Sequence, residues 1–211
     1  MTKRYPLLGI VAVVVAYLSI TLAILASPWF SWLDNALSDL GNTSVQRNIT
    51  SGSALVFDGG LIISGVLTIA FAFLLLRDFK FSWKYLIWGI PLTISAIDLS
   101  MIGIFNESFG NIHLVVSIIF FFFTALSLFL YSYVSFPMGT PKTGALALFL
   151  GVFCCIMWVG RWPWQGVAIQ EVTTSAASAA FVIILSILVL SGRMKTVIFV
   201  STERLENVRS K

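Results

Sequence analysis

Six long apolar stretches dominate the sequence and restrict its possible folds more than any other feature. Each contains about 17–24 residues, and about 20 are needed to cross the roughly 30 Å hydrocarbon core of a bilayer. The chain is 58% hydrophobic and only 10% charged, with a mean hydropathy of +0.97. A soluble domain of this length cannot bury so much apolar surface. The stretches cover approximately residues 7–26, 54–76, 85–104, 112–134, 144–160 and 167–190.

We therefore predict an all-α integral membrane protein, with six transmembrane helices forming one domain over residues 1–211. No connection between the stretches exceeds about 30 residues, so no separate soluble domain is expected. The first stretch follows Lys3 and Arg4, as the core of a signal peptide would. Its apolar core exceeds the usual 7–15 residues, so we expect a retained span.

The basic residues predict the orientation in the membrane. If the N-terminus is cytoplasmic, only Arg47 and Arg161 of the 13 Lys and Arg residues fall outside, as the positive-inside rule requires. We therefore predict a multi-pass protein of the cell membrane with both termini in the cytoplasm. The basic tail over residues 192–211 is expected to anchor this topology or to contact the anionic inner leaflet. The net charge of +4 reflects topology, so no nucleic-acid partner is expected.

Common soluble-enzyme motifs are absent. The sequence has no CxxC, HExxH, GxSxG or glycine-rich phosphate loop. Cys154 and Cys155 are adjacent in the fifth stretch and point about 100° apart on a helix, so we expect them to be packing residues. One histidine without a spaced ligand pair predicts neither a metal site nor a cofactor.

The acidic residues are as unevenly distributed as the basic ones. Asp58 and Glu171 lie about four residues inside their stretches, and Asp98 about six, which places all three within roughly 6–9 Å of the outer boundary. A carboxylate facing lipid there would cost a few kcal/mol, so these acids should face the bundle interior. Six of the nine acids fall on the outer side: Asp34, Asp39, Asp58, Asp98, Glu107 and Glu171.

Polar residues follow helical spacing in two stretches, and each series begins with an ionisable residue at the outer level. We interpret the two stripes as walls of one acidic, outward-facing cavity. A purely structural network is the alternative, because small polar residues commonly join transmembrane helices. The stripes are His113, Ser117, Thr124 and Ser127 in the fourth stretch, and Glu171, Thr174, Ser175 and Ser178 in the sixth.

The segment after the first stretch, PWFSWLDNALSDLG over residues 28–41, has an amphipathic period. Its apolar residues recur at helical spacing and Gly41 suits a C-terminal cap. We predict a short amphipathic helix on the outer leaflet or over the mouth of the bundle. Asp39 would then oppose the helix dipole, so we expect it to face Arg47, Arg161, His113 or a ligand, in the same pocket as Glu171.

Four segments in this order resemble the domain-of-unknown-function family 998 of bacteria and archaea, over nearly the whole chain. More distantly, the chain is similar to the Frag1/DRAM/Sfk1 family, through an S-D-x-G segment, a Phe and Gly at the second span, an F-N before a histidine, and a glutamate opening the last span. These features correspond to Ser38, Asp39, Gly41, Phe57, Gly60, Phe105, Asn106, His113 and Glu171. The four segments are WFSWLDNALSDLG, FDGGLIISGVL, GIFNESFGNIH and GVAIQEV.

The resemblance implies a six-span bundle with a role in lipid biology. The leading hypothesis is that the outer cavity binds a polar lipid head group or a small amphiphile. Whether it also catalyses a reaction is left open; His113, Glu171 and Asp98 would be the acid/base candidates. The ligand-binding candidates are Ser38, Asp39, Asp58, Asp98, Asn106, Glu107, His113, Arg161 and Glu171.

Two other functions remain open at this point. One is a proton- or cation-coupled transporter or channel in which Asp98 and Glu171 titrate. The other is a non-catalytic scaffold within the membrane. The expected partner is membrane lipid, and the sequence leaves self-association open.

Overall fold

The protein forms a bundle of six long helices. The computed structural model describes residues 4–43 and 51–194, and within them it contains no β-strand. Six helices are long and apolar enough to cross a membrane, which confirms the predicted all-α class. They begin and end within about three residues of the predicted stretches. They are α1 (Leu7–Leu25), α2 (Ser51–Asp78), α3 (Trp83–Ile104), α4 (Asn111–Ser135), α5 (Pro141–Val159) and α6 (Ala168–Leu190).

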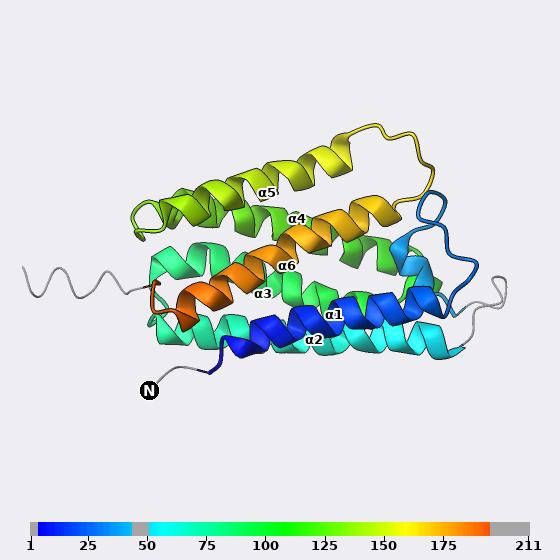
Figure 1. The fold of residues 1–211 in the computed structure, drawn as a ribbon, viewed down its shortest axis with the longest axis horizontal. Coiled ribbons are helices and arrows are strands. Elements are labelled where there is room, and N and C mark those ends of the chain that lie inside the picture. Colours follow the sequence, from blue (N-terminus) through cyan, green and yellow to red (C-terminus); the bar gives the residue numbers. More distant parts are fainter. Residues whose placement is uncertain (1–3, 44–50, 195–211) are drawn as a thin grey trace, which may run out of the picture.

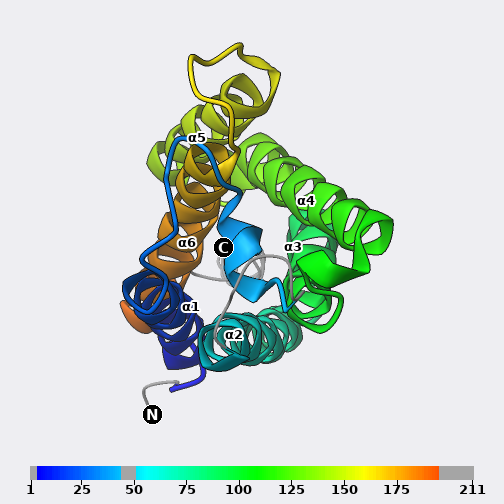
Figure 2. The same cartoon turned by 90° about the vertical axis from the view of Figure 1, so that its right-hand side faces the viewer.

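The helices alternate in direction, so α1 begins and α6 ends at the same end of the bundle (Figure 1). Each helix packs on the next in sequence, and α6 returns to pack on α1. Gly60 permits a close approach of α2 to α1, because a Cβ there would overlap the Ser19 side chain. The result is a closed ring viewed along its axis (Figure 2).

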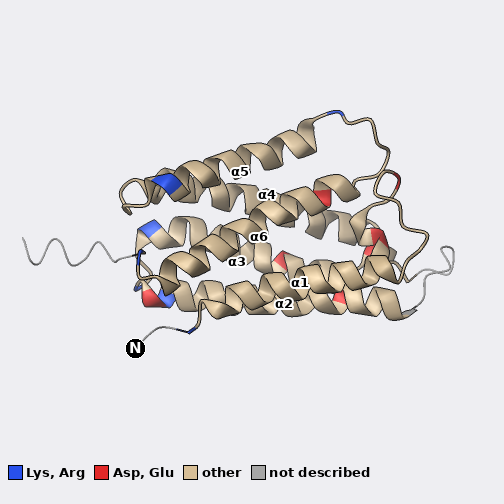
Figure 3. Cartoon of the chain, in the orientation of Figure 1, with Lys and Arg blue, Asp and Glu red and all other residues tan. Residues whose placement is uncertain are grey.

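Charge divides the bundle into two ends (Figure 3). Most of the Lys and Arg residues drawn lie where α1 begins, and we call this the basic end; most Asp and Glu residues lie toward the other, acidic end. This distribution agrees with the strongly asymmetric charges of the sequence.

The basic half of the bundle has a packed aromatic core. Trp88 and Tyr131 are fully buried, and their ring centroids are 5.2 Å apart. Phe181 of α6 packs edge-on against both rings, and Phe71 of α2 joins the same cluster. Large side chains from α2, α3, α4 and α6 therefore fill the interior of this half.

Candidate functional site

The linker between α1 and α2 does not form the predicted amphipathic helix. Among the described residues of this linker, 26–43, only Leu37–Gly41, named η1, is helical, and it is a five-residue 3-10 helix. Before it, Ala36 is extended (φ −83°, ψ 151°), and the Asn35 side chain accepts the N–H of Ser31 at 2.9 Å. Polar side chains here compete with helical hydrogen bonds.

Backbone contacts with the α5–α6 loop provide a second reason for the missing helix. The carbonyl of Leu33 accepts the N–H groups of Gln165 and Gly166, and that of Asn35 accepts those of Val167 and Ala168. Each of these two carbonyls already accepts two hydrogen bonds, which uses both of its lone pairs, so neither can also accept the N–H of a helix in the linker. The linker is thus held against α6 by its backbone.

The helix η1 lies in the mouth of the ring at the acidic end (Figure 2). Leu40 is completely buried and Leu37 nearly so. Both pack in a cluster that includes Phe57 of α2, Phe120 of α4 and Ala168 of α6. The segment therefore closes the end of the bundle as a plug, and we use "plug" for Leu37–Gly41 below.

Glu171 joins the plug to α6. It is in the first turn of α6, where a negative charge is favourable to the helix dipole, and it is 9% exposed. Its Oε2 accepts the backbone N–H of Leu37. The Glu171 carboxylate therefore holds the plug to the start of α6.

His113 and Glu107 form a second polar contact beside the plug. His113 Nδ1 lies 2.8 Å from the Phe105 carbonyl oxygen, which can only accept, so Nδ1 carries a proton. Its Nε2 lies 3.1 Å from Glu107 Oε2, and Ser38 Oγ donates to the same oxygen at 3.1 Å. Ser117 Oγ lies 3.3 Å from the same ring nitrogen. Glu107 belongs to η3 (Glu107–Phe109), a 3-10 turn before α4.

Asp58 and Asn106 are brought together on the other side of the plug. Asn106 Nδ2 donates to Asp58 Oδ2 at 2.8 Å, while Asp58 Oδ1 is buried without a hydrogen bond. Gly41 of the plug is adjacent, because a Cβ at this position would overlap Asp58 Oδ1. A side chain at position 41 would therefore require the Asp58 carboxylate to shift.

Three further candidates are placed differently from the prediction. Asp39 is buried, but its Oδ2 accepts hydrogen bonds from Asn35 Nδ2 at 2.9 Å and the Ala36 N–H at 3.2 Å. Its carboxylate thus turns back toward its own linker, and it lines neither of the cavities described below. Asp98 is buried in α3, and Arg161 is exposed in the α5–α6 loop; they line neither cavity either. The suggested partner Arg47 lies outside the described residues.

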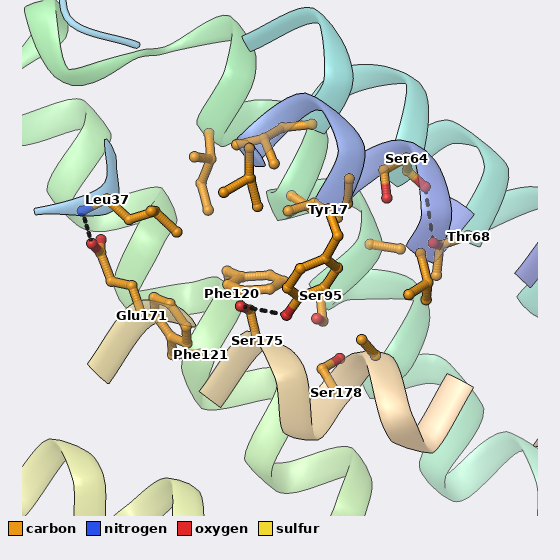
Figure 4. A pocket seen from close by; sticks show the side chains of 18 of the residues that line it. Tyr17, Leu37, Ser64, Thr68, Ser95, Phe120, Phe121, Glu171, Ser175 and Ser178 are labelled. Atoms are coloured by element: carbon orange, nitrogen blue, oxygen red, sulfur yellow. Dashed lines mark hydrogen bonds between the residues drawn. The ribbon is translucent and has the colours of Figure 1, made fainter. Parts of the chain in front are cut away.

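A chamber lies within the ring, directly beneath the plug (Figure 4). It has a volume of about 100 Å³. Tyr17 of α1 hydrogen bonds to Ser175 of α6 across it at 3.0 Å. Its polar lining is Tyr17, Ser38, Ser64, Thr68, Ser95, Ser117, Glu171, Ser175 and Ser178.

A larger groove of about 510 Å³ runs between α4 and α5. Ile118, Phe122 and Val159 line it and are at least 58% exposed, so the groove opens on the outer surface of the bundle. Its polar end is at the plug, and its walls further along are mainly apolar. The polar end is formed by Ser38, Glu107, His113 and Glu171, next to Ser117. We call this cavity the α4–α5 groove.

The chamber and the groove share four lining residues: Ser38, Ser117, Phe121 and Glu171. Phe121 also packs against Trp158 of α5, with ring centroids 4.7 Å apart. Sequence reasoning missed Tyr17, Phe121 and Trp158. An isolated tyrosine in the first span was the only signal for Tyr17, and nothing distinguished Phe121 from its phenylalanine neighbours.

Some residues of the two polar stripes line cavities, and others join neighbouring helices by hydrogen bonds. Ser117, Ser175 and Ser178 line cavities, whereas Thr124 hydrogen bonds to Ser95 at 2.8 Å. Ser127 donates to the Trp88 carbonyl. The described residues contain no group of three or more His, Cys, Asp or Glu placed to hold a metal ion.

Comparison with protein families identifies the chain. The model of the family "Protein of unknown function (DUF998)" matches residues 10–188. The chain belongs to the DUF998 family. No curated protein and no solved structure matches it. The match covers all six helices almost completely, so the plug and both cavities lie within the family's domain. The more distant likeness to the Frag1/DRAM/Sfk1 family stays a prediction.

Proposed function

We propose that this DUF998 protein binds a single-chain amphiphile, or one chain of a membrane lipid, in the α4–α5 groove. The observation that carries this proposal is the groove's polarity: its polar groups converge at one end, and Leu114, Phe122 and Trp158 contribute to its apolar walls. Its volume falls within the usual range for small-molecule sites, about 300–1,000 Å³.

The length of the groove suits a chain of lipid dimensions. Leu114 and Ala125 both line it, and at 1.5 Å per helical residue they are about 16 Å apart along α4. Half of a 30 Å hydrocarbon core is about 15 Å. An acyl chain could therefore lie along α4 with its head group at the plug.

The charge distribution supports an outward-facing position for the plug. The basic end would lie in the cytoplasm, together with both termini, and the polar end of the groove would meet the outer leaflet. The ligand would enter sideways from that leaflet, between α4 and α5.

We favour binding over conduction because of the packed aromatic core. A path across the membrane would have to pass Trp88, Tyr131 and Phe181. In the part of the chain that the structure describes, these side chains belong to the buried cluster that fills the basic half of the bundle. Asp98, one of the two acids in the transport hypothesis, lines neither cavity. If a reaction takes place, His113 and Glu171 are the acid/base candidates that line the groove.

The test is to fill the groove and measure the lipid that remains bound. Cys155 lines the groove and is exposed, so Cys155→Trp would occupy its space. Val152 is on the same helix and is 43% exposed, but it does not line the groove, so Val152→Trp is the matched control. Native mass spectrometry of protein purified in mild detergent would measure bound amphiphile.

We expect Cys155→Trp to reduce the lipid-bound fraction several-fold and Val152→Trp to leave it unchanged. Equal lipid occupancy in Cys155→Trp and the parent protein would contradict the proposal.

A further inference from the structure

The polar end of the α4–α5 groove is rich in hydrogen-bond acceptors. It presents two carboxylates, Glu107 and Glu171, and none of the described residues lining the groove is Lys or Arg. Against these two acids stands one imidazole, that of His113. With both carboxylates ionised, the polar end carries an excess of negative charge even when His113 is protonated.

Most of the donors at this end already face protein acceptors. His113 directs Nδ1 to the Phe105 carbonyl and Nε2 to Glu107. Ser38 Oγ donates to the same Glu107 oxygen. What the protein leaves for a ligand is therefore mainly carboxylate lone pairs.

Of the two carboxylates that line the groove, Glu171 is the more deeply buried and so gains more from a positive partner. It is 9% exposed, and a buried carboxylate is stable when it is paired with a cation or well hydrogen-bonded. Its hydrogen bonds come from the backbone N–H groups of Leu37 and Ser38, which are neutral amides. Because Glu171 lines the groove, a cation in the groove would reach it.

We propose that the head group bound here is a protonated primary amine, so the ligand class is a cationic alkylamine-type amphiphile. This inference rests on the proposed function of the groove. An ammonium group has three donors and no acceptor, and it would form charge-assisted hydrogen bonds with Glu171 and Glu107. A phosphate or sulfate head group would instead place its negative charge and its acceptor oxygens next to carboxylates, which are also negatively charged and also accept hydrogen bonds.

The test compares three probes with the same chain: dodecylamine, dodecanol and dodecyl phosphate. Each is titrated into the full-length protein in non-ionic detergent at neutral pH, and binding is measured by native mass spectrometry. Hydrogen bonds to charged groups contribute about 1.5–3 kcal/mol, so we expect dodecylamine to bind at least about ten-fold more tightly than dodecanol. Dodecyl phosphate should bind most weakly.

The results separate this inference from the proposed function. Equal affinities for the amine and the alcohol would overturn the amine inference and leave an amphiphile groove in place. Tightest binding of dodecyl phosphate would also overturn it. Binding of none of the three probes would contradict the proposed function itself.

Two variants connect the preference to the groove. Glu171→Gln keeps an oxygen to accept the Leu37 N–H but removes the charge, and we expect it to lose most of the preference for dodecylamine while dodecanol affinity changes less than about two-fold. Glu107→Gln should change the preference in the same direction and serves if Glu171→Gln does not fold.

The control is Asp34→Asn, which removes the same charge from an exposed acid of the linker. Asp34 bonds to Ser31 Oγ and does not line the groove, so its variant should retain the full amine preference. An equal loss in Asp34→Asn and Glu171→Gln would assign the preference to general surface charge and overturn the inference. An unchanged preference in both glutamate variants would overturn it as well.

Discussion

At the scale of single residues, Glu171 links the closure of the bundle to its cavities. Its carboxylate accepts the Leu37 N–H of the plug, and the same side chain lines both the chamber and the α4–α5 groove. A ligand that contacts Glu171 would therefore also affect the contact between α6 and the plug.

Removal of this acceptor should loosen the plug. Glu171→Ala leaves the buried Leu37 N–H unpaired, at a cost of about 1–3 kcal/mol, whereas Glu171→Gln retains an acceptor. Amide hydrogen exchange should become about ten-fold faster or more at Leu37 in Glu171→Ala, and much less so in Glu171→Gln. Similar exchange in the alanine variant and the parent protein would show that this bond does not hold the plug.

A second residue-scale prediction concerns Tyr5, before the start of α1. Its hydroxyl donates to Asp78 Oδ2 at 2.9 Å, and burial, followed by the Asp78 contact, raises the pKa of the phenol well above its usual value. Tyr5→Phe should reduce the free energy of unfolding by about 1 kcal/mol at neutral pH, measured by denaturant titration in detergent.

The sign of the pH dependence follows from the raised pKa of Tyr5. The neutral phenol stabilises the fold below the unfolded-state pKa of about 10. Above that pH the unfolded chain loses the proton first, so this contribution declines. The difference between parent and Tyr5→Phe should therefore shrink above about pH 10; a difference that grows there would contradict the account.

At the scale of elements, the plug depends on two leucines rather than on helical length. Leu37 and Leu40 are buried, whereas Trp32 and Leu33 are 40% and 54% exposed. The amphipathic period correctly marked the two leucines as apolar contacts. It could not show that the backbone would bend at Ala36, because the contacts that cause this come from the distant loop before α6.

Two leucines of the linker provide a matched test of the plug. Leu40→Ala should lower stability by about 2–5 kcal/mol, because it leaves a cavity at a fully buried site. Leu33→Ala removes the same atoms from an exposed side chain and should change stability by less than about 0.5 kcal/mol. Chemical denaturation in detergent measures both; equal losses would mean that the plug is not anchored by burial.

At the scale of the whole molecule, the hydrophobic stretches were sufficient to predict six helices and their order. The site was predicted less completely. Depth along each helix correctly placed Glu171 and His113 at the same end as Ser38 and Glu107, and the structure brings all four to the groove. Depth alone does not determine which neighbour a side chain faces, so Asp58, Asp98 and Asp39 were also assigned to the cavity, although none lines it.

Orientation in the membrane is a whole-molecule prediction that cysteine labelling can test. In a chain with Cys154 and Cys155 replaced by alanine, a single cysteine is introduced as Asp34→Cys at the acidic end or Lys142→Cys at the basic end. Both positions are exposed. A membrane-impermeant maleimide should label Asp34→Cys in intact cells, and Lys142→Cys only after permeabilisation. The opposite pattern would place the plug in the cytoplasm.

The most direct test of the α4–α5 groove is photo-crosslinking with a membrane-soluble single-chain amphiphile. Hexadecylamine carrying a diazirine in its chain would be incorporated into bilayers containing the full-length protein, with the matching hexadecanol in parallel. Adducts would be mapped by mass spectrometry. We expect them to concentrate on groove residues such as Leu114, Phe122 and Trp158, and to decrease in Cys155→Trp. Adducts distributed evenly over other exposed positions, such as Leu18 of α1 and Phe73 of α2, would contradict the account.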